Sequence, residues 1–368
     1  MTVEGPGLIF TIISFLVAIS VLVFVHEWGH YIVARLFGVR VEVFSIGFGP
    51  EIWGRTDRHG TRWKVSVLPI GGYVRFFGDA NEASRAREDI ERLTPEEQAL
   101  SFHHKSVGAR MAIVAAGPVI NFLFAILIYA ALFVSFGQSY QPPEVTEVLP
   151  DSPAAAAGLA PGDRIVRVAG TEIETARDLV RVVGLYPGLP VEIEVDRAGT
   201  HFTREVRLAR VVQTDRFGNE YARGQLGVRL GGEREVHSLG PARALVAAGA
   251  ETVDMVRMML VATGQVIMGV RSVDDLGGPV RIAKITGEQA SLGLVAFIEF
   301  IALISINLGL VNLFPIPMLD GGHLLFLVVE GLKGSPLNPR LQELGYLVGL
   351  AFILTLMLFL TWNDLQSL

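Results

Sequence analysis

The chain has 368 residues, of which 51% are hydrophobic and only 18% are charged. Because soluble proteins carry about 25% charged residues, this composition excludes an ordinary soluble domain. The absence of cysteine excludes disulfide scaffolds, thiol nucleophiles and cysteine-ligated metals, and the formal net charge of -6 gives no basic footprint for nucleic acid. A metal bound by this chain must therefore be held by nitrogen and oxygen.

The apolar residues gather into four uncharged blocks, each about 20 residues long or longer. About 20 apolar residues, each rising 1.5 Å along a helix, cross a hydrocarbon core of ~30 Å. The sequence therefore predicts a polytopic α-helical membrane protein with four transmembrane helices, over residues 5–37, 110–137, 293–322 and 342–362.

Lysine and arginine are concentrated between the first two predicted helices, whereas neither terminal tail contains one. By the positive-inside rule, the segment between these helices is cytoplasmic and both termini lie outside. The long stretch between the second and third helices is then expected on the outer side of the membrane.

Residues 38–79 alternate between apolar and polar side chains around a polar turn at residues 57–60. This pattern predicts a β-hairpin, and its place after the first helix puts it at the cytoplasmic membrane face. An exposed edge strand of such a hairpin can pair with an extended peptide, although a purely structural hairpin fits the pattern as well. Residues 80–109 are polar and helix-prone, and they are expected to form a solvated cytoplasmic connection.

Residues 140–232 have the pattern of a compact module, with strands expected near 145–149, 164–168, 191–195 and 201–208 and a short helix near 176–183. The passage from Ser152 to Gly170, in which Pro161-Gly162-Asp163 turns into a strand, resembles a PDZ domain. The fold class is therefore expected to include one inserted extracytoplasmic PDZ domain of α+β type. Charges interrupt the apolar residues of the following segment, 240–290, which predicts amphipathic helices on the outer face.

The first predicted helix contains His26-Glu27-Trp28-Gly29-His30, which fits the pattern H-E-x-x-H. Two histidines four residues apart lie on one face of a helix, so both rings can reach one Zn²⁺, and the adjacent Glu27 can act as a general base. Ionisable residues at membrane depth are costly and usually functional. The alternative is an interfacial charge cluster that marks the end of the helix.

A catalytic zinc usually takes a third protein ligand, and Asp320 is the main candidate. It ends the third apolar block in the passage Asn312-Leu-Phe-Pro-Ile-Pro-Met-Leu-Asp320-Gly-Gly322. The first and third helices both run inward, so His26 and Asp320 are expected at a similar depth, near the cytoplasmic side. Two prolines in this passage forbid a regular helix, and a broken backbone at membrane depth needs a cavity or a protein partner. His323 competes with Asp320 for the role of third ligand.

H-E-x-x-H in the first helix, N-x-x-P-x-P-x-L-D-G in the third, and a PDZ-like module between the second and third together resemble the site-2 protease family of intramembrane zinc metalloproteases. The resemblance covers nearly the whole chain and is closest to the bacterial sigma-E-regulator group. It implies one zinc ion per chain bound by His26, His30 and Asp320, Glu27 as the catalytic base, and Asn312 as a residue that hydrogen-bonds the substrate backbone. It also implies a bacterial inner-membrane protein whose module and termini are periplasmic.

Two further contact regions follow from the same resemblance. The hairpin is expected to bind the unwound substrate through its end at Gly71-Gly72-Tyr73-Val74. In the module, Leu226-Gly227-Val228 resembles a carboxylate-binding loop, with a plain turn as the alternative. The short pattern from Gly117 to Asn121 resembles a motif of the family, and small-residue helix packing explains it equally well.

The partners implied by the resemblance are the lipid bilayer and single-pass membrane proteins, with anti-sigma factors and remnant signal peptides as the expected substrates. The module departs from well-known relatives in this group, which carry two PDZ domains where this sequence has room for one. Two other functions remain open at this point. One is a catalytically inactive membrane scaffold that gathers partners through its PDZ domain, and the other is a metal transporter that uses the intramembrane ligands as a relay.

Overall fold

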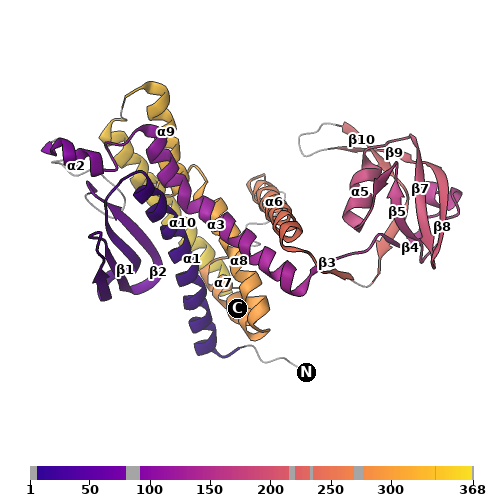
Figure 1. The fold of residues 1–368 in the computed structure, drawn as a ribbon, viewed down its shortest axis with the longest axis horizontal. Helices are drawn as coiled ribbons and strands as arrows, with labels where there is room; N and C mark the ends of the chain where they lie inside the picture. Colours follow the sequence, from indigo (N-terminus) through magenta and orange to yellow (C-terminus); the bar gives the residue numbers. More distant parts are fainter. Residues whose placement is uncertain are drawn as a thin grey trace. The chain divides into compact units, whose positions relative to one another are not determined.

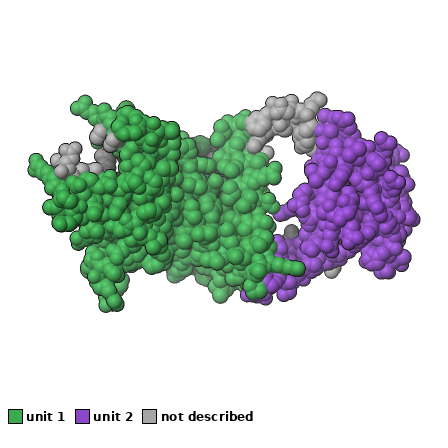
Figure 2. All heavy atoms as spheres, turned by 45° about the horizontal axis from the view of Figure 1, so that its top comes forward, with its two compact units in different colours: residues 1–131, 241–368 green, residues 132–240 purple. Residues whose placement is uncertain are grey.

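The computed structural model describes residues 6–79, 92–214, 220–232, 235–268, 277–335 and 337–366. The chain divides into two compact units, coloured green and purple in Figure 2. The first unit combines residues 1–131 with 241–368, and the second comprises residues 132–240. The second unit is thus an insertion into the first, and it extends on both sides beyond the predicted range 140–232.

Four helices of the first unit are long and apolar enough to cross a membrane, as predicted. Their bounds are α1 (Leu8–Leu36), α3 (Val107–Phe136), α8 (Leu294–Asn312) and α10 (Pro339–Gln366). Most of their side chains face outward rather than into the protein, and most of those outward side chains are apolar, with Glu299 of α8 as an exposed exception. A surface of this kind requires lipid around it.

The third predicted transmembrane helix is shorter than expected, so the prediction of one helix over 293–322 is wrong in its extent. Helix α8 ends at Asn312, and a separate helix, α9 (Asp320–Lys333), begins at Asp320. Pro315 and Pro317 lie in the break, where each lacks the backbone N–H that a helix needs. The break separates the C-terminal end of α8 from the N-terminal end of α9 by only seven residues, 313–319, with Asp320 as the first residue of α9.

Two more helices follow the inserted unit, α6 (Pro241–Ile267) and α7 (Pro279–Ser291). Helix α7 has no local N-cap, because Gly278 precedes it. Instead the buried carboxylate of Asp364, in the last turn of α10, accepts hydrogen bonds of 2.9 Å from the backbone N–H groups of Gly278 and Arg281. A side chain 83 residues away along the chain thus caps α7.

The predicted hairpin is present as two antiparallel strands, β1 (Val41–Thr56) and β2 (Arg62–Phe76), which lie beside α1 (Figure 1). An aromatic cluster joins the sheet to the helix. Phe44 of β1 stacks on Trp63 of β2 with ring centroids 4.4 Å apart, and it meets Phe24 and Tyr31 of α1 at 5.7 and 5.9 Å. Offset and edge-on aromatic contacts of this kind hold the hairpin against the helix that carries the H-E-x-x-H motif. A short helix, α2 (Pro95–Leu100), precedes α3.

The inserted unit is built on a six-stranded sheet in the order β11-β4-β5-β7-β8, with β6 paired to β5. The strands predicted near 145–149, 164–168, 191–195 and 201–208 and the helix near 176–183 are confirmed. The observed bounds are β4 (Glu144–Val148), α4 (Pro153–Ala156), β5 (Arg164–Val168), β6 (Thr171–Glu172), α5 (Ala176–Gly184), β7 (Pro190–Arg197), β8 (Thr200–Arg207), β9 (Ala209–Thr214), β10 (Glu220–Gln225) and β11 (Val228–Gly231). Strands β9 and β10 form a separate pair.

Among its described residues, the core of this unit holds one charged group, the fully buried carboxylate of Asp163. Arg197 donates to both of its oxygens, at 2.6 and 2.9 Å, and the backbone N–H of Ala160 donates at 2.8 Å. Burial acts to raise the pKa of the Asp163 carboxyl, but these hydrogen bonds outweigh burial and hold that pKa below its ordinary value of 3.8.

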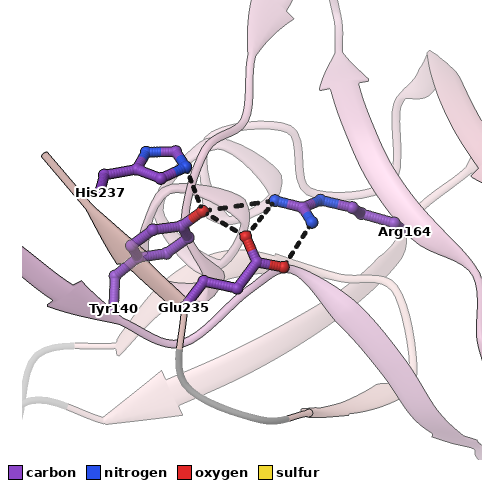
Figure 3. Close-up of polar contacts among 4 residues, drawn as sticks. All are labelled: Tyr140, Arg164, Glu235 and His237. Atoms are coloured by element: carbon purple, nitrogen blue, oxygen red, sulfur yellow. Dashed lines mark hydrogen bonds and ion pairs between the residues drawn. The ribbon is translucent and has the colours of Figure 1, made fainter.

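A two-stranded stalk forms both ends of the inserted unit, because β3 (Gln138–Tyr140) pairs with β12 (Glu235–His237). Figure 3 shows the polar cluster that ties this stalk to the sheet. Arg164 of β5 donates to both carboxylate oxygens of Glu235, at 2.6 and 3.1 Å. The Tyr140 hydroxyl donates to Glu235 at 2.6 Å and lies 2.8 Å from Nε2 of His237. The first and last strands of the inserted unit are therefore held to each other and to its sheet.

Candidate metal centre

Three predicted ligands come together in the first unit. His26 and His30 lie one turn apart on α1, and Asp320 is the first residue of α9. Oδ2 of Asp320 is 3.1 Å from Nε2 of His26 and 3.5 Å from Nε2 of His30, and the two Nε2 atoms are 3.3 Å apart. Among the described residues, this is the only group of three or more potential ligand atoms within 4.8 Å of one another.

This arrangement fits a cation bound among the three side chains. Oδ2 of Asp320 is buried and has no well-oriented hydrogen bond within the described part of the chain. Two imidazole nitrogens, 3.3 Å from each other, and an otherwise unpartnered carboxylate oxygen therefore lie around one point. Two histidines and one carboxylate are an established ligand set for a catalytic zinc ion, which keeps a further position for substrate or water. His323 does not belong to this group of converging ligand atoms, and its Nδ1 atom lies 3.3 Å from the hydroxyl of Tyr346.

Helix α3 orients both histidines. Nδ1 of His30 donates to the backbone carbonyl of Ile113 at 2.9 Å, which leaves Nε2 with its lone pair. The side-chain amide of Asn121 lies 3.0 Å from Nδ1 of His26, and Oδ1 of this amide is buried without a partner in the described structure. Turning the amide by 180° lets Oδ1 accept the Nδ1–H, which frees Nε2 of His26 for a metal as well.

Small residues let α3 approach the ligands this closely. A Cβ atom on Gly117 would touch Nε2 of His30 and would lie 2.6 Å from Cε1 of the same ring and 2.9 Å from Cε1 of His26. A Cβ atom on Gly29 would collide with the backbone of Ala116. Gly117 and Asn121 therefore line the candidate metal centre, so their role is not limited to the packing of α3 on α1.

A tight turn places Asp320. The N–H of Leu319 donates to the carbonyl of Ile316 at 3.0 Å, with Pro317 and Met318 at the central positions. Proline followed by a positive φ is a type II turn, and Met318 has a φ of 88° at the position that favours glycine. Such a conformation costs about 1–3 kcal/mol and persists only where the surroundings enforce it. Here the turn delivers Asp320 to the histidines at the start of α9.

Residues 14–356 match the profile of Peptidase family M50. The chain belongs to peptidase family M50. This membership confirms the resemblance to site-2 proteases, and the M50 peptidase described here is accordingly a zinc-dependent metalloprotease.

Curated relatives cover almost the whole M50 peptidase. A protein of Agrobacterium fabrum named Putative zinc metalloprotease Atu1380 is 42% identical over 361 residues, which are 97% of this chain and 96% of that one. Metalloprotease MmpA of Caulobacter vibrioides is 38% identical over 388 residues, 98% of this chain and 96% of that one. Among solved structures, the PDZ domain of an SdrC-like protein from Listeria monocytogenes is 21% identical, with a TM-score of 0.20, and covers 25% of this chain and 90% of that chain.

Glu27 of the M50 peptidase is buried beside the candidate ligands, and strand β2 of the hairpin packs against it. A Cβ atom on Gly72 would lie 3.2 Å from Cγ of Glu27, and the backbone N–H of Val74 interacts with the Glu27 carboxylate. Because this N–H is directed at Glu27, the edge of β2 that carries it faces the centre. The other two hairpin residues singled out from the sequence, Gly71 and Tyr73, pack against Phe48 instead.

The remaining predicted site residues lie outside the ligand cluster. Asn312 is half-buried at the end of α8, before the break that leads to Asp320, and within the described residues its side chain makes no hydrogen bond. In the inserted unit, Leu226, Gly227 and Val228 line a groove of about 310 Å³ together with residues of α5. Gly227 has a φ of +80°, so glycine suits this turn.

Proposed function

We propose that this M50 peptidase hydrolyses peptide bonds within or beside the transmembrane segments of single-pass membrane proteins. The observation that supports this proposal is the depth of the ligands in the helices. His26 and His30 belong to α1, a candidate membrane span, and Asp320 follows the break after α8, a second candidate span. A centre assembled from residues inside one candidate membrane helix and a residue that follows the end of another is suited to a substrate that arrives through the bilayer.

The residues present support hydrolysis rather than a structural metal site. Zinc held by His26, His30 and Asp320 would supply a Lewis acid for the scissile carbonyl and for water. Glu27 would take the proton from the attacking water and return it to the leaving amine. A purely structural zinc site needs no such carboxylate, which counts against the inactive scaffold, and the inserted module counts against a transporter.

The hairpin would supply the backbone partners that an unwound substrate needs. A transmembrane helix hides its amides in hydrogen bonds, so cleavage requires an extended segment. The β2 edge at Gly72 and Val74 faces Glu27 and can pair with such a segment by β-strand addition. Asn312 would then hydrogen-bond the substrate backbone on the opposite side of the scissile bond.

The inserted unit would select substrates. Its groove beside Leu226, Gly227 and Val228 has the size and the backbone turn suited to a peptide end, and the unit would either bind a free C-terminus or exclude substrates with large external domains. The concentration of basic residues between α1 and α3 supports a cytoplasmic location for that segment, in a bacterial inner membrane, with the inserted unit and both termini in the periplasm. Membrane-anchored anti-sigma factors and remnant signal peptides are the substrates we propose.

The test uses purified full-length protein, a labelled single-pass substrate and a chelator. We expect cleavage by the wild type, loss of cleavage in Glu27→Gln, and loss on chelation that added zinc restores. Glu27→Gln should still bind zinc, because the three ligands are unchanged. Cleavage that persists in Glu27→Gln would show that this proposal is wrong.

The role of the β2 edge is tested separately with Val74→Pro, which removes the N–H directed at Glu27. We expect this variant to cleave an unaltered transmembrane substrate poorly. A substrate whose scissile segment already contains helix-breaking residues should depend less on Val74. Equal loss for both substrates would point to general damage and argue against edge pairing.

A further inference from the structure

A basic pocket lies at the C-terminal end of α1, within the first unit and apart from the metal ligands. It has a volume of about 410 Å³ and is lined by Arg35, Gly38, Val39, Arg40, His59 and Leu100. None of these side chains is acidic. We call this hollow the α1 pocket.

Three chain segments build the α1 pocket and fix its shape. Gly38, with a φ of +70°, turns the chain away from α1. The N–H of Arg40 donates to the carbonyl of Leu100 at 3.0 Å, which joins the chain after α1 to the end of α2. The turn between β1 and β2 closes the third side, because Gly60 lies beside the guanidinium of Arg40. The pocket is therefore a defined concavity between packed segments.

In the described part of the chain, neither Arg35 nor Arg40 of the α1 pocket forms an ion pair, and the guanidinium of Arg40 lies over the ring of Phe77. Nζ of Lys105 lies 3.7 Å from the position that a Cβ atom on Gly38 would take. The nearby carboxylate of Asp57 keeps its negative charge, but its oxygens accept hydrogen bonds from the backbone of its own turn and from Trp63 rather than from an arginine. Basic side chains that line a hollow and have no acidic partner among the described residues favour an anion.

The end of α1 does not oppose this anion. The last carbonyls of a helix carry partial negative charge, which normally repels one. Here the carbonyls of Val33, Ala34 and Arg35 already accept hydrogen bonds from the three residues that follow the helix. This closure leaves the side-chain cations as the main electrostatic feature of the pocket.

Apolar side chains border the α1 pocket on the side of the helix. Leu36 is 78% exposed and Phe37 is 44% exposed, at the end of a candidate membrane span. An exposed apolar surface next to a basic hollow matches an amphiphile, with an acidic head and an apolar tail. A free phosphate ion could bind in the α1 pocket but would leave Leu36 and Phe37 exposed to solvent.

We propose that the α1 pocket binds the phosphate group of an anionic phospholipid. The guanidinium groups of Arg35 and Arg40 would hold the phosphate, to which arginine can donate two parallel hydrogen bonds. The acyl chains would lie beside Leu36 and Phe37. A lipid bound there would contact both the last turn of α1 and the hairpin. It would thereby stabilise the packing of the hairpin on α1, the helix that carries His26 and His30. A free phosphate ion could make the same hydrogen bonds to the two arginines, so the experiment must distinguish it from the phosphate of a lipid.

The experiment titrates short-chain lipids onto full-length protein in detergent and counts bound molecules by native mass spectrometry. The three probes are dioctanoyl phosphatidylglycerol, dioctanoyl phosphatidylcholine and inorganic phosphate. We expect one phosphatidylglycerol per chain and no comparable binding of phosphatidylcholine. Arg35→Gln/Arg40→Gln should weaken phosphatidylglycerol binding by about tenfold or more, since each basic residue near a lipid surface contributes substantially.

The matched control is Arg55→Gln/Arg58→Gln, which removes two exposed charges from the same hairpin region but none from the α1 pocket. It should bind phosphatidylglycerol as the wild type does. Equal weakening in both double variants, or equal binding of the two lipids, would overturn the proposal. Binding of inorganic phosphate but not of lipid would also overturn it, by assigning the pocket to the free ion. Elution volume and zinc content report whether each variant is folded.

Discussion

Replacing Gly117 with alanine provides the sharpest test of the metal centre. The added Cβ atom would touch Nε2 of His30 and would lie 2.6 Å from Cε1 of that ring. Carbon atoms pack at about 3.5 Å, so the ring or helix α3 must move by about 0.9 Å. Metal sites tolerate displacements of roughly 0.2 Å in their ligands. The methyl group therefore disturbs the ligands several times more than the centre can accept.

Helix propensity and packing act in opposite directions on the stability of Gly117→Ala. Glycine in the interior of a helix costs about 1 kcal/mol relative to alanine, but forcing extra volume into a close contact costs about 1–3 kcal/mol, and a Cβ atom directly before Pro118 adds a steric clash. Displaced ligands should lower zinc affinity by about 10–100-fold, and a misplacement near 1 Å can cost about 100-fold in rate. We expect a folded variant whose apo form unfolds at a somewhat lower temperature than the apo wild type and that binds zinc poorly.

Zinc affinity is measured by competition with a chromophoric chelator, and thermal unfolding is recorded in the same detergent without metal. Gly108→Ala is the matched control, because Gly108 lies in the same helix and a Cβ atom there would meet nothing within 4 Å. It should behave like the wild type in zinc affinity. If Gly117→Ala binds zinc as tightly as Gly108→Ala, the inferred approach of α3 to the ligands is incorrect.

Three more predictions follow from contacts described above. Asn121→Leu should lower zinc affinity about 10–100-fold by chelator competition while Asn121→Asp retains most of it, because only the latter keeps an acceptor for the imidazole N–H. Arg110→Ala should lower the thermal midpoint strongly, because the largely buried carboxylate of Glu330 loses its bidentate partner, and adding Glu330→Leu should restore much of the loss. The ionised carboxylate of Asp163 stabilises the inserted unit, because the pKa of this carboxyl is lower in the folded than in the unfolded chain. The stabilisation is fully present above pH 3.8, the pKa of an ordinary Asp carboxyl, and is lost as pH falls through the folded pKa. Hydrogen-exchange protection of β5 and β7 should therefore fall more steeply below pH 3.8 in the wild type than in Asp163→Asn.

The proximity of the three candidate ligands could be anticipated from the sequence because their signals are local. Two histidines four residues apart share a helix face whatever the rest of the chain does, and Asp320 follows two prolines that must end a helix. The proline signal also carried information that the predicted range 293–322 did not use, namely that a second helix starts at Asp320. The two prolines therefore marked the break between α8 and α9, but the uninterrupted apolar block favoured a single helix across it.

The supporting contacts could not be predicted in the same way, because they depend on how distant helices pack. Nothing in the sequence pairs Asp364 with the start of α7, or Tyr140 and Glu235 with Arg164. For Asn121 a signal did exist, since a polar amide inside an apolar helix is costly for the reason applied to His26. Its partner on α1 nevertheless required the structure.

The separation of the candidate ligands along the chain has a consequence for biosynthesis. Asp320 is translated nearly 300 residues after His26 and His30. At about 5–20 residues per second, the ribosome needs roughly 15–60 s to cover that interval. Throughout this time the first helix can reside in the membrane with its histidines but without the carboxylate that completes the centre. The order of the sequence thus delays assembly of the candidate metal centre until Asp320 has been made.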